Sequence, residues 1–215
     1  MAASELYLIF EISDSDLEAH TARLSAAVGA APIASVLLQP APGDTLNARI
    51  LKPLVEAVQA AGIAVLVADD ADLARIVRAD GLHLSWNKDQ PGRMAAAREV
   101  LGGRLMLGAD AGRSRDDAMT LGEMGADYIA FGIPRHVEDR DTAFARQCEL
   151  VSWWAEIFVP PCVALDVPDT HSARALAHAN ADFVAVTLGS GTTPHEATAL
   201  VKSFSAAIGD AKIPA

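Results

Sequence analysis

Cysteine is scarce in this chain, which has only Cys148 and Cys162 among its 215 residues. Two cysteines exclude a disulfide framework and a structural zinc site built from thiolates, and we expect both to be reduced thiols of a cytoplasmic protein. The sequence also lacks an apolar run of the ~18 residues that suggest a membrane span. Its first residues, MAASELYLIFEISDSD, have no basic segment ahead of the apolar ones, so we expect no signal peptide.

Basic residues are also few. The sequence has 17 Lys and Arg against 28 Asp and Glu, which gives a formal net charge of −11. Nucleic acids and anionic membranes are bound by basic faces, and we therefore expect neither as a partner. A local phosphate site remains compatible with this charge, because backbone N–H groups and helix N-termini bind phosphate without Lys or Arg. The expected partner is a small phosphorylated molecule, and a homo-oligomer is left open.

Aromatic residues make up only 5% of the chain and hydrophobic residues 51%, which indicates the Ala/Val/Leu/Ile core common in α/β proteins. Eight short apolar runs alternate with amphipathic segments. They are continuous rather than alternating, as expected for parallel strands buried on both faces. The expected strands are Leu6–Ile12, Ala34–Gln39, Ala64–Asp69, Gly81–Ser85, Leu105–Asp110, Tyr128–Gly132, Cys162–Val167 and Phe183–Leu188.

Eight β/α units in about 200 residues predict a single (β/α)8 TIM barrel, with residues 1–215 forming one domain. A doubly wound sheet is the alternative, but it more often uses about five to seven strands, and no G-x-G-x-x-G follows the first strand. A small-residue turn followed by Asp and a new strand recurs at three joints, in Arg78–Leu84, Met124–Ile129 and Ala179–Val184.

A TIM barrel carries its chemistry at the C-terminal ends of its strands. Asp69 closes an aliphatic strand and is a candidate Mg²⁺ ligand facing a phosphorylated molecule. Its alternative role is to cap the following helix, which Asp70 can equally supply. Asp89 begins the next helical segment and has the same two interpretations, metal ligand or helix cap.

Three further features lie at strand ends. His83 has Leu on both sides, so it is either a hydrogen-bonded histidine of the barrel wall or a general base. Asp110 and Asp166 also end strands, and a ring of acids needs protons, cations or a cationic ligand to coexist. The stretch GSGTTPHE, which starts at Gly189, is either a backbone phosphate cradle or a plain loop and cap.

Three longer stretches share motifs with a known family. They are AVLVADDADLARIVRADGLHLS, LMLGADAGRSRDDAMTLGEMGADYIAFGIP and PCVALDVPDTHSARALAHANADFVAVTLGSG, which together cover most of Ala64–Gly191. The first resembles a family strand followed by Asn-Asp and xxxLAxxxxADGVHLG. The second is similar to GxSxHxxxEaxxAxxxGADYIxxGP, and the third to the last two units. The family is the thiamine-phosphate synthases, whose wider superfamily includes the thiazole tautomerases.

The resemblance implies a barrel enzyme of thiamine biosynthesis. Such enzymes join hydroxymethylpyrimidine pyrophosphate to thiazole phosphate, while Mg²⁺ and basic residues hold the departing pyrophosphate. The thiazole nitrogen then captures a pyrimidine carbocation. We assign His83 and Asp110 as candidate catalytic residues and Asp69 and Asp89 as candidate Mg²⁺ ligands. The candidate substrate-binding residues are Gln39, Trp86, Lys88, Arg135, His136, Asp166, Gly189, Ser190 and Gly191.

The chain departs from the family pattern at charged positions. The family Gln-x-Arg-x-Lys after the second strand is replaced by Leu37, Gln39 and Ala41, so two cations are absent. Family HLGQxD is HLSWNKD here, which puts Lys88 at the place of the carboxylate and leaves Asp89 one residue further on.

The other departures also change the expected ligand contacts. Trp86 replaces a Gln, where it can stack on a flat pyrimidine-like ring or fill the pocket. The family GPxxxTxTK is GIPRHVEDRD, whose cations are Arg135, His136 and Arg140. The family Gly-Gly is Asp166–Val167, which puts a side chain and a negative charge where a phosphate would lie.

Three functions stay open at this point, and with them whether the chain is an enzyme at all. It is a synthase with altered ligand contacts, or a repurposed member that binds a related ligand as a regulator, carrier or tautomerase-like enzyme. The third function is a scaffold whose partner face includes Trp153 and Trp154, although packing of the outer helix explains this pair as well.

Overall fold

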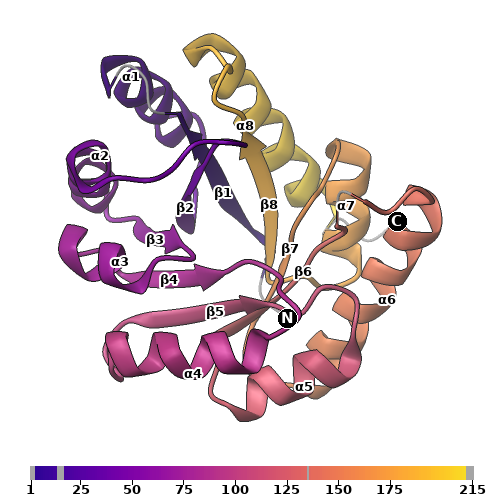
Figure 1. The fold of residues 1–215 in the computed structure, drawn as a ribbon. Coiled ribbons are helices and arrows are strands. Elements are labelled where there is room, and N and C mark those ends of the chain that lie inside the picture. The colour runs from indigo at the N-terminus through magenta and orange to yellow at the C-terminus, as the bar shows by residue number, and fades with distance from the viewer. Residues whose placement is uncertain (1–2, 14–16, 135, 212–215) are drawn as a thin grey trace.

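In the computed structural model, which describes residues 3–13, 17–134 and 136–211, eight parallel strands form a closed barrel inside eight helices (Figure 1). Each strand pairs with the next, and β8 pairs with β1 to close the barrel. The strands are β1 (Glu5–Ile12), β2 (Ser35–Pro40), β3 (Ala64–Ala68), β4 (Gly81–Leu84), β5 (Met106–Asp110), β6 (Tyr128–Phe131), β7 (Cys162–Ala164) and β8 (Phe183–Leu188). The helices are α1 (Leu17–Val28), α2 (Ala48–Ala60), α3 (Ala71–Val77), α4 (Gln90–Leu101), α5 (Arg115–Glu123), α6 (Arg140–Ile157), α7 (Thr170–His178) and α8 (Pro194–Asp210).

The predicted (β/α)8 barrel and its eight strands are confirmed, with shifts at some strand ends. The strand predicted to reach Asp69 stops at Ala68, and the strand predicted to reach Val167 stops at Ala164. Asp69 has φ of 62° and Asp166 has φ of 53°, which is left-handed backbone that no strand contains. Asp tolerates this conformation better than most residues, and the chain turns sharply out of the barrel there.

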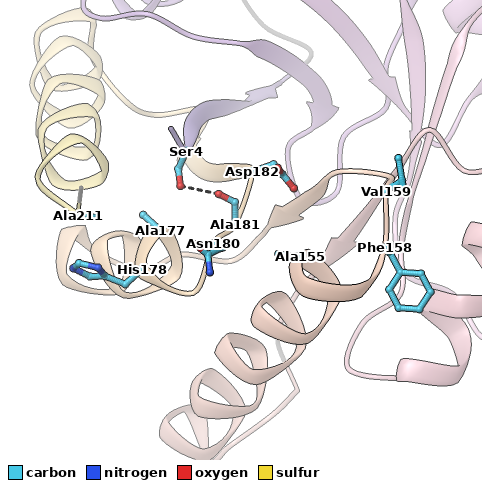
Figure 2. A pocket seen from close by; sticks show the side chains of 10 residues that line it. All are labelled: Ser4, Ala155, Phe158, Val159, Ala177, His178, Asn180, Ala181, Asp182 and Ala211. Carbon is cyan, nitrogen blue, oxygen red and sulfur yellow. Dashed lines mark hydrogen bonds between the residues drawn. The ribbon is translucent and has the colours of Figure 1, made fainter. Parts of the chain in front are cut away.

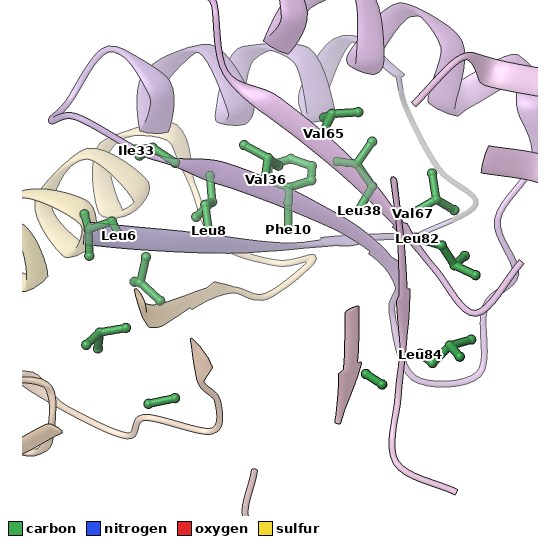
Figure 3. Close-up of a cluster of buried hydrophobic side chains, with 14 of the residues drawn as sticks. Leu6, Leu8, Phe10, Ile33, Val36, Leu38, Val65, Val67, Leu82 and Leu84 are labelled. Carbon is green, nitrogen blue, oxygen red and sulfur yellow. The ribbon is translucent and has the colours of Figure 1, made fainter. Parts of the chain in front are cut away.

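Side chains alternate between the two faces of each strand. One set points into the barrel and forms an inner cluster with Tyr7, Leu37, Leu66 and Tyr128. The other set points outward and packs under the helices, as Figure 3 shows for Leu8, Phe10 and Val36 among others. Because both faces of the strands are buried, their sequences are continuous apolar runs.

The recurrent Asp at three joints has a structural role at the N-terminal end of the barrel. The carboxylates of Asp80, Asp127 and Asp182 each accept a main-chain N–H near the start of the neighbouring strand. These are β3 at 2.8 Å, β5 at 2.7 Å and β7 at 2.8 Å. The motif therefore joins β3 to β4, β5 to β6 and β7 to β8 where the ladder would otherwise leave donors unpaired.

At the opposite end, three buried side chains from helices join neighbouring strand ends. Gln90 of α4 donates to main-chain carbonyls at the ends of β4 and β5, at 3.2 and 3.0 Å. Gln147 of α6 donates to β6 and to the residue after β7, at 2.6 and 2.7 Å. Arg23 of α1 donates to the carbonyls of Glu11 in β1 and Gly189 after β8. These contacts fix the rim that carries the candidate site.

Trp153 and Trp154 in α6 both pack against neighbouring residues of the chain. Trp154 is fully buried and donates from Nε1 to the Pro160 carbonyl at 2.7 Å. Trp153 packs edge-on against Phe158, with ring centroids 5.1 Å apart, and has the Arg115 guanidinium over its ring. The interpretation of this pair as outer-helix packing therefore agrees with the structure. Across the described residues, we find no helix with the length and apolar character to cross a membrane.

Candidate functional site

The mouth of the barrel, at the C-terminal ends of the strands, holds a small cavity of about 260 Å³. Gln39 and Asp69, both predicted as site residues, line it together with Ser85 and Glu11. Glu11 is nearly buried, and the Gln39 amide donates to its carboxylate over 3.5 Å. Residues at or just after the C-terminal ends of β1, β2, β3 and β4 therefore lie together at one opening, as expected for a TIM barrel.

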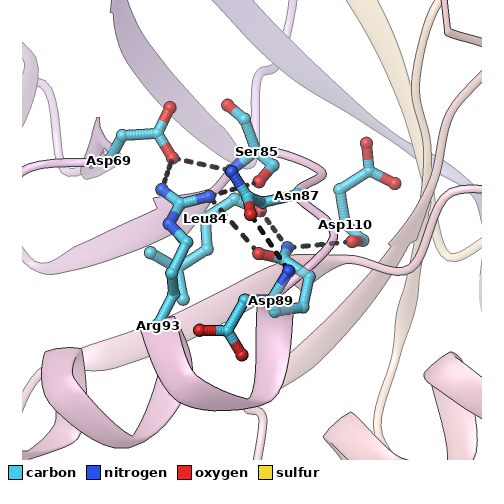
Figure 4. A network of polar contacts seen from close by, with 8 residues as sticks. Asp69, Leu84, Ser85, Asn87, Asp89, Arg93 and Asp110 are labelled. Carbon is cyan, nitrogen blue, oxygen red and sulfur yellow. Dashed lines mark hydrogen bonds and ion pairs between the residues drawn. The ribbon is translucent and has the colours of Figure 1, made fainter.

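Asp69 is held by two donors on one of its oxygens. Its Oδ1 accepts the Ser85 N–H at 2.8 Å and an Nη2–H of Arg93 at 2.6 Å (Figure 4). The Arg93 guanidinium also donates to the Ser85 carbonyl at 2.8 Å and to the Gln90 side chain at 3.3 Å. A cation of the chain itself therefore occupies the space next to Asp69.

The two predicted Mg²⁺ ligands have separate partners. Asp89 caps α4 by accepting the Gly92 N–H at 3.2 Å, and Asp70, not Asp69, caps α3. The helix-cap interpretation of Asp89 is thus confirmed. Among the described residues there is no group of three or more His, Cys, Asp or Glu side chains placed to hold a metal ion. With Arg93 on Asp69 and α4 on Asp89, the residues present do not fit a Mg²⁺ ion.

Asp110 is a buried carboxyl at the end of β5. The N–H groups of Gly112, Gly132 and Trp86 donate to it, the first at 2.7 Å. Burial raises the pKa of Asp110 to about 7, and the nearby charge of Asp166 raises it further, against these hydrogen bonds. Asp110 is therefore a carboxyl of the mouth whose pKa lies near neutrality.

Asp166 meets Asp110 beside Gly132. A Cβ placed on Gly132 would lie 2.8 Å from Asp166 Oδ2 and 3.1 Å from Asp110 Oδ2, so only glycine admits both carboxylates there. Asp166 also accepts the Ile133 N–H at 2.8 Å. The expected ring of acids is thus partly real, and a proton on Asp110 lets the pair coexist.

His83 points into the barrel core. Its Nδ1 lies 2.9 Å from the Tyr128 hydroxyl, which lies 2.9 Å from the Tyr7 hydroxyl. The imidazole is 2% exposed and stacks on the Tyr128 ring. Burial lowers the pKa of His83 to about 4 and raises the pKa of both tyrosines. This agrees with the barrel-wall interpretation of His83 rather than with a general base open to a ligand.

The loop after β4 carries the next two predicted residues. The Trp86 indole, 42% exposed, covers Gly112, whose φ of 60° and lack of a side chain make room for it. Lys88 lies exposed in the turn before α4. Trp86 therefore packs over the loop after β5 and leaves one part of its ring open to solvent.

The loops after β6 and β8 hold the remaining predictions. His136 is exposed, and Arg135 lies outside the described residues. Ser190 and Gly191 are exposed, and the Gly189 carbonyl accepts a hydrogen bond from the Arg23 guanidinium. The following helix begins with a capping box in which Glu196 and Thr193 bond reciprocally. The loop-and-cap interpretation therefore holds for α8, and its own Glu196 carboxylate already lies at the helix N-terminus, where an anion would bind.

The sequence did not point to three residues that shape the rim and interior of the barrel: Arg23 and Arg93 at the rim, and Tyr128 inside. Arg93 carried a usable signal, because it follows the cap residue Asp89 by four positions and thus lies in the first turn of α4. Arg23 and Tyr128 carried none, since an Arg in an amphipathic helix and a Tyr in a strand are common.

A second cavity, of about 480 Å³, lies at the other end of the barrel. Figure 2 shows Ser4, Asp182 and Phe158 around it, and Ser4 and Asp182 directly precede β1 and β8. It is thus remote from the strand ends that carry chemistry in this fold.

Comparison with known proteins relates the chain to a family. The family model described as Thiamine monophosphate synthase matches residues 6–189. The chain belongs to this family.

Two bacterial members match nearly end to end. The thiamine-phosphate synthase of Hyphomonas neptunium is 33% identical over 208 residues, which are 94% of this chain and 93% of the relative. That of Rhodospirillum centenum is 34% identical over 208 residues, covering 95% and 97%.

Solved structures agree on the fold. A thiamine phosphate pyrophosphorylase from Pyrococcus furiosus has a TM-score of 0.72 at 18% identity and covers 97% of both chains. A Mycobacterium tuberculosis tryptophan synthase also reaches 0.72, at 17% identity, with 95% of this chain and 93% of the other covered. Likeness at such identity shows the barrel alone.

Proposed function

We propose that this chain catalyses the thiamine-phosphate synthase reaction, with the cavity between β1 and β4 as part of its substrate site. The observation that carries the proposal is the end-to-end match to two curated synthases, together with a cavity lined by Gln39 and Asp69 at the strand ends. A match of full length at this identity relates whole barrels rather than one shared motif.

The bonds in this reaction balance without a proton acceptor. The C–O bond between the pyrimidine methylene and pyrophosphate breaks with its electron pair on the pyrophosphate. A C–N bond then forms from the thiazole nitrogen to the methylene. A neutral His83 inside the barrel wall is compatible with such chemistry, because no base is needed. What the chain must supply is orientation and stabilisation of the leaving anion.

The residues of the mouth support these tasks unequally. Gln39 offers an amide to the cavity, and Trp86 offers an exposed aromatic face that suits a flat heterocycle. Lys88 and His136 are exposed basic side chains on the loops after β4 and β6. A leaving anion held by these groups relies on local charge, since the molecule as a whole carries −11.

A second candidate function is favoured by one observation, the Asp110–Asp166 pair beside Gly132. Two acids at that point repel a phosphate and favour a hydrogen-bond donor or a cation. A repurposed family member that binds a ligand with less phosphate, such as a hydroxymethylpyrimidine without its pyrophosphate, fits this pair.

The deciding experiment measures thiamine phosphate and pyrophosphate formed by purified protein from hydroxymethylpyrimidine pyrophosphate and thiazole phosphate. The Rhodospirillum centenum synthase serves as the positive control in the same buffer. We expect turnover by the wild type and a loss of about tenfold or more in Gln39→Ala, since that amide lines the cavity. Gln59→Ala is the matched control, because Gln59 bonds to Arg78 and Asp80 at the other end of the barrel.

No product from a folded wild type, with the control enzyme active, would contradict the synthase proposal. The second candidate then predicts that the unphosphorylated pyrimidine raises the melting temperature and that the pyrophosphate ester does not.

A further inference from the structure

The resemblance implies a divalent cation at Asp69, and the structure puts an arginine there. We infer that the Arg93 guanidinium is the permanent counter-ion of Asp69, so that the mouth of this barrel receives its anionic ligand without a divalent cation at that carboxylate. The inference rests on the proposed function only for the identity of the anion.

The first step is the geometry of the pair. Arg93 Nη2 lies 2.6 Å from Asp69 Oδ1, while Nη1 lies 2.8 Å from the Ser85 carbonyl. The Ser85 N–H donates to the same Asp69 oxygen at 2.8 Å. Asp69, Ser85 and Arg93 thus form a closed ring that joins the end of β3, the end of β4 and the first turn of α4 (Figure 4). The ring fixes the guanidinium by two strand ends rather than by a single surface contact.

The second step is competition for the oxygen. A Mg²⁺ ion binds carboxylate oxygen at about 2.0–2.1 Å with near-octahedral geometry. Asp69 Oδ1 already has two donors, one of them a full positive charge at 2.6 Å. A metal there would face the guanidinium at close range, and its binding would require Arg93 to give up its bonds to Asp69 and Ser85.

The third step concerns the other carboxylate. Asp89 points to the N-terminus of α4, where a Cβ on Gly92 would meet both of its oxygens, at 2.5 and 2.7 Å. It therefore serves the helix on which Arg93 stands, four residues further on. Where the resemblance implies two metal ligands, this chain has one residue that pairs with Arg93 and one that caps its helix.

The fourth step relates the pair to the cavity. Asp69 and Ser85 line the mouth cavity, and Arg93 contacts both from α4. Without Arg93, the negative charge of Asp69 would face any anion in the cavity. Arg93 neutralises that charge in place, because a guanidinium brings a positive charge and donors in a fixed planar arrangement. Arg93 is in this sense a positioning and charge-setting residue rather than a catalytic one.

The test titrates Mn²⁺, as a spectroscopic substitute for Mg²⁺, into the full-length protein and follows free Mn²⁺ by electron paramagnetic resonance. We expect the wild type to show no binding that depends on Asp69. Arg93→Gln should gain a site at least about tenfold tighter than any in the wild type, and adding Asp69→Asn should remove it. Arg98→Gln is the matched control, because Arg98 lies on the same helix but pairs with Asp127 at the other end of the barrel.

Wild-type protein that binds Mn²⁺ as tightly as Arg93→Gln, and loses it in Asp69→Asn, would overturn the inference. If Arg93→Gln fails to fold, Arg93→Lys replaces it, since a lysine keeps the charge but cannot hold Asp69 and Ser85 together. The expected result is then a measurable Mn²⁺ site in Arg93→Lys, weaker than the one expected for Arg93→Gln. No Mn²⁺ site in Arg93→Lys, together with an Asp69-dependent site in the wild type, would contradict the inference.

A second readout uses inorganic pyrophosphate and isothermal titration calorimetry. We expect binding in EDTA, a loss of about tenfold or more in Arg93→Gln and no change in Arg98→Gln. Binding that requires Mg²⁺ would overturn the inference. Pyrophosphate that binds neither in EDTA nor in the presence of Mg²⁺ would count against the proposed function alone. The Mn²⁺ titration would still decide the role of Arg93.

Discussion

Single residues at the mouth owe their properties to burial more than to their chemical type. Asp69 directly follows β3 and Asp110 is the last residue of β5. Asp69 is exposed and paired with Arg93, whereas Asp110 is buried beside Asp166. Desolvation therefore raises the pKa of Asp110 to about 7. Two aspartates at the ends of apolar runs thus lie in different environments, and Asp110 is buried enough for desolvation to raise its pKa to about 7.

Asp110 should give the protein a pH dependence of known sign. Its folded pKa of about 7 exceeds the ordinary value of 3.8, so the folded state binds the proton more tightly than the unfolded state. The associated stability is present below about pH 4 and is lost as pH rises through 7. We expect the free energy of unfolding to fall by on the order of 2–4 kcal/mol from this group.

Urea unfolding between pH 4 and pH 8, at about half-unit steps, measures this slope. Asp110→Asn should remove it, whatever its effect at any single pH, because an amide does not titrate in this range. Asp116→Asn, at an exposed position in the first turn of α5, should keep the wild-type slope. An unchanged slope in Asp110→Asn would show that another group is responsible.

At the scale of elements, the joints between helices and strands do more than turn the chain. The Asp of each recurrent joint accepts an N–H from the preceding strand. The repeat of a small-residue turn followed by Asp is visible in the sequence, and it correctly indicated that β4, β6 and β8 follow. Its hydrogen-bond partners were not predictable, because they lie 15 to 20 residues away and depend on which strands become neighbours.

Asp182→Ala should destabilise the barrel by about 1–2 kcal/mol, because it leaves the Cys162 N–H at the start of β7 without its acceptor. Urea denaturation followed by circular dichroism measures the change. Asp210→Ala, which breaks an exposed ion pair with Arg174, should change stability by less than about 0.5 kcal/mol. Equal losses of unfolding free energy in the two variants would mean that the Asp182 hydrogen bond stabilises the barrel no more than an exposed ion pair does.

At the scale of the whole molecule, the barrel closes where β8 pairs with β1. Arg23 lies at this seam, buried, with its guanidinium over the Phe10 ring and its donors on both strand ends. Burial lowers the pKa of Arg23, while the charge of Glu11 opposes that shift. A buried guanidinium whose two Nη groups donate to main-chain carbonyls is sensitive to removal, because the carbonyls lose their donors.

Arg23→Met should lower the free energy of unfolding by about 2–4 kcal/mol and speed hydrogen exchange in the loop after β8. Hydrogen exchange read by mass spectrometry locates the effect. In Arg174→Met, at an exposed helix position, both quantities should stay near wild type. Faster exchange spread evenly over the barrel, with none concentrated at the β1–β8 seam, would refute the role given to Arg23.

The order of apolar runs and helix caps along the chain was enough to predict the barrel, its eight strands and the end at which its polar residues gather. These follow from local features, namely apolar runs, helix caps and the rule that parallel strands end on one side. Two long-range pairs depended on tertiary structure: Asp69 with Arg93 at the mouth, 24 residues apart, and Tyr7 with Tyr128 inside the barrel, 121 residues apart. The same holds for His83, whose burial against Tyr128 no neighbour in the chain reveals. The physical reason is that burial and long-range contacts exist only once the sheet has closed, and these set the charge and the hydrogen bonds of each side chain.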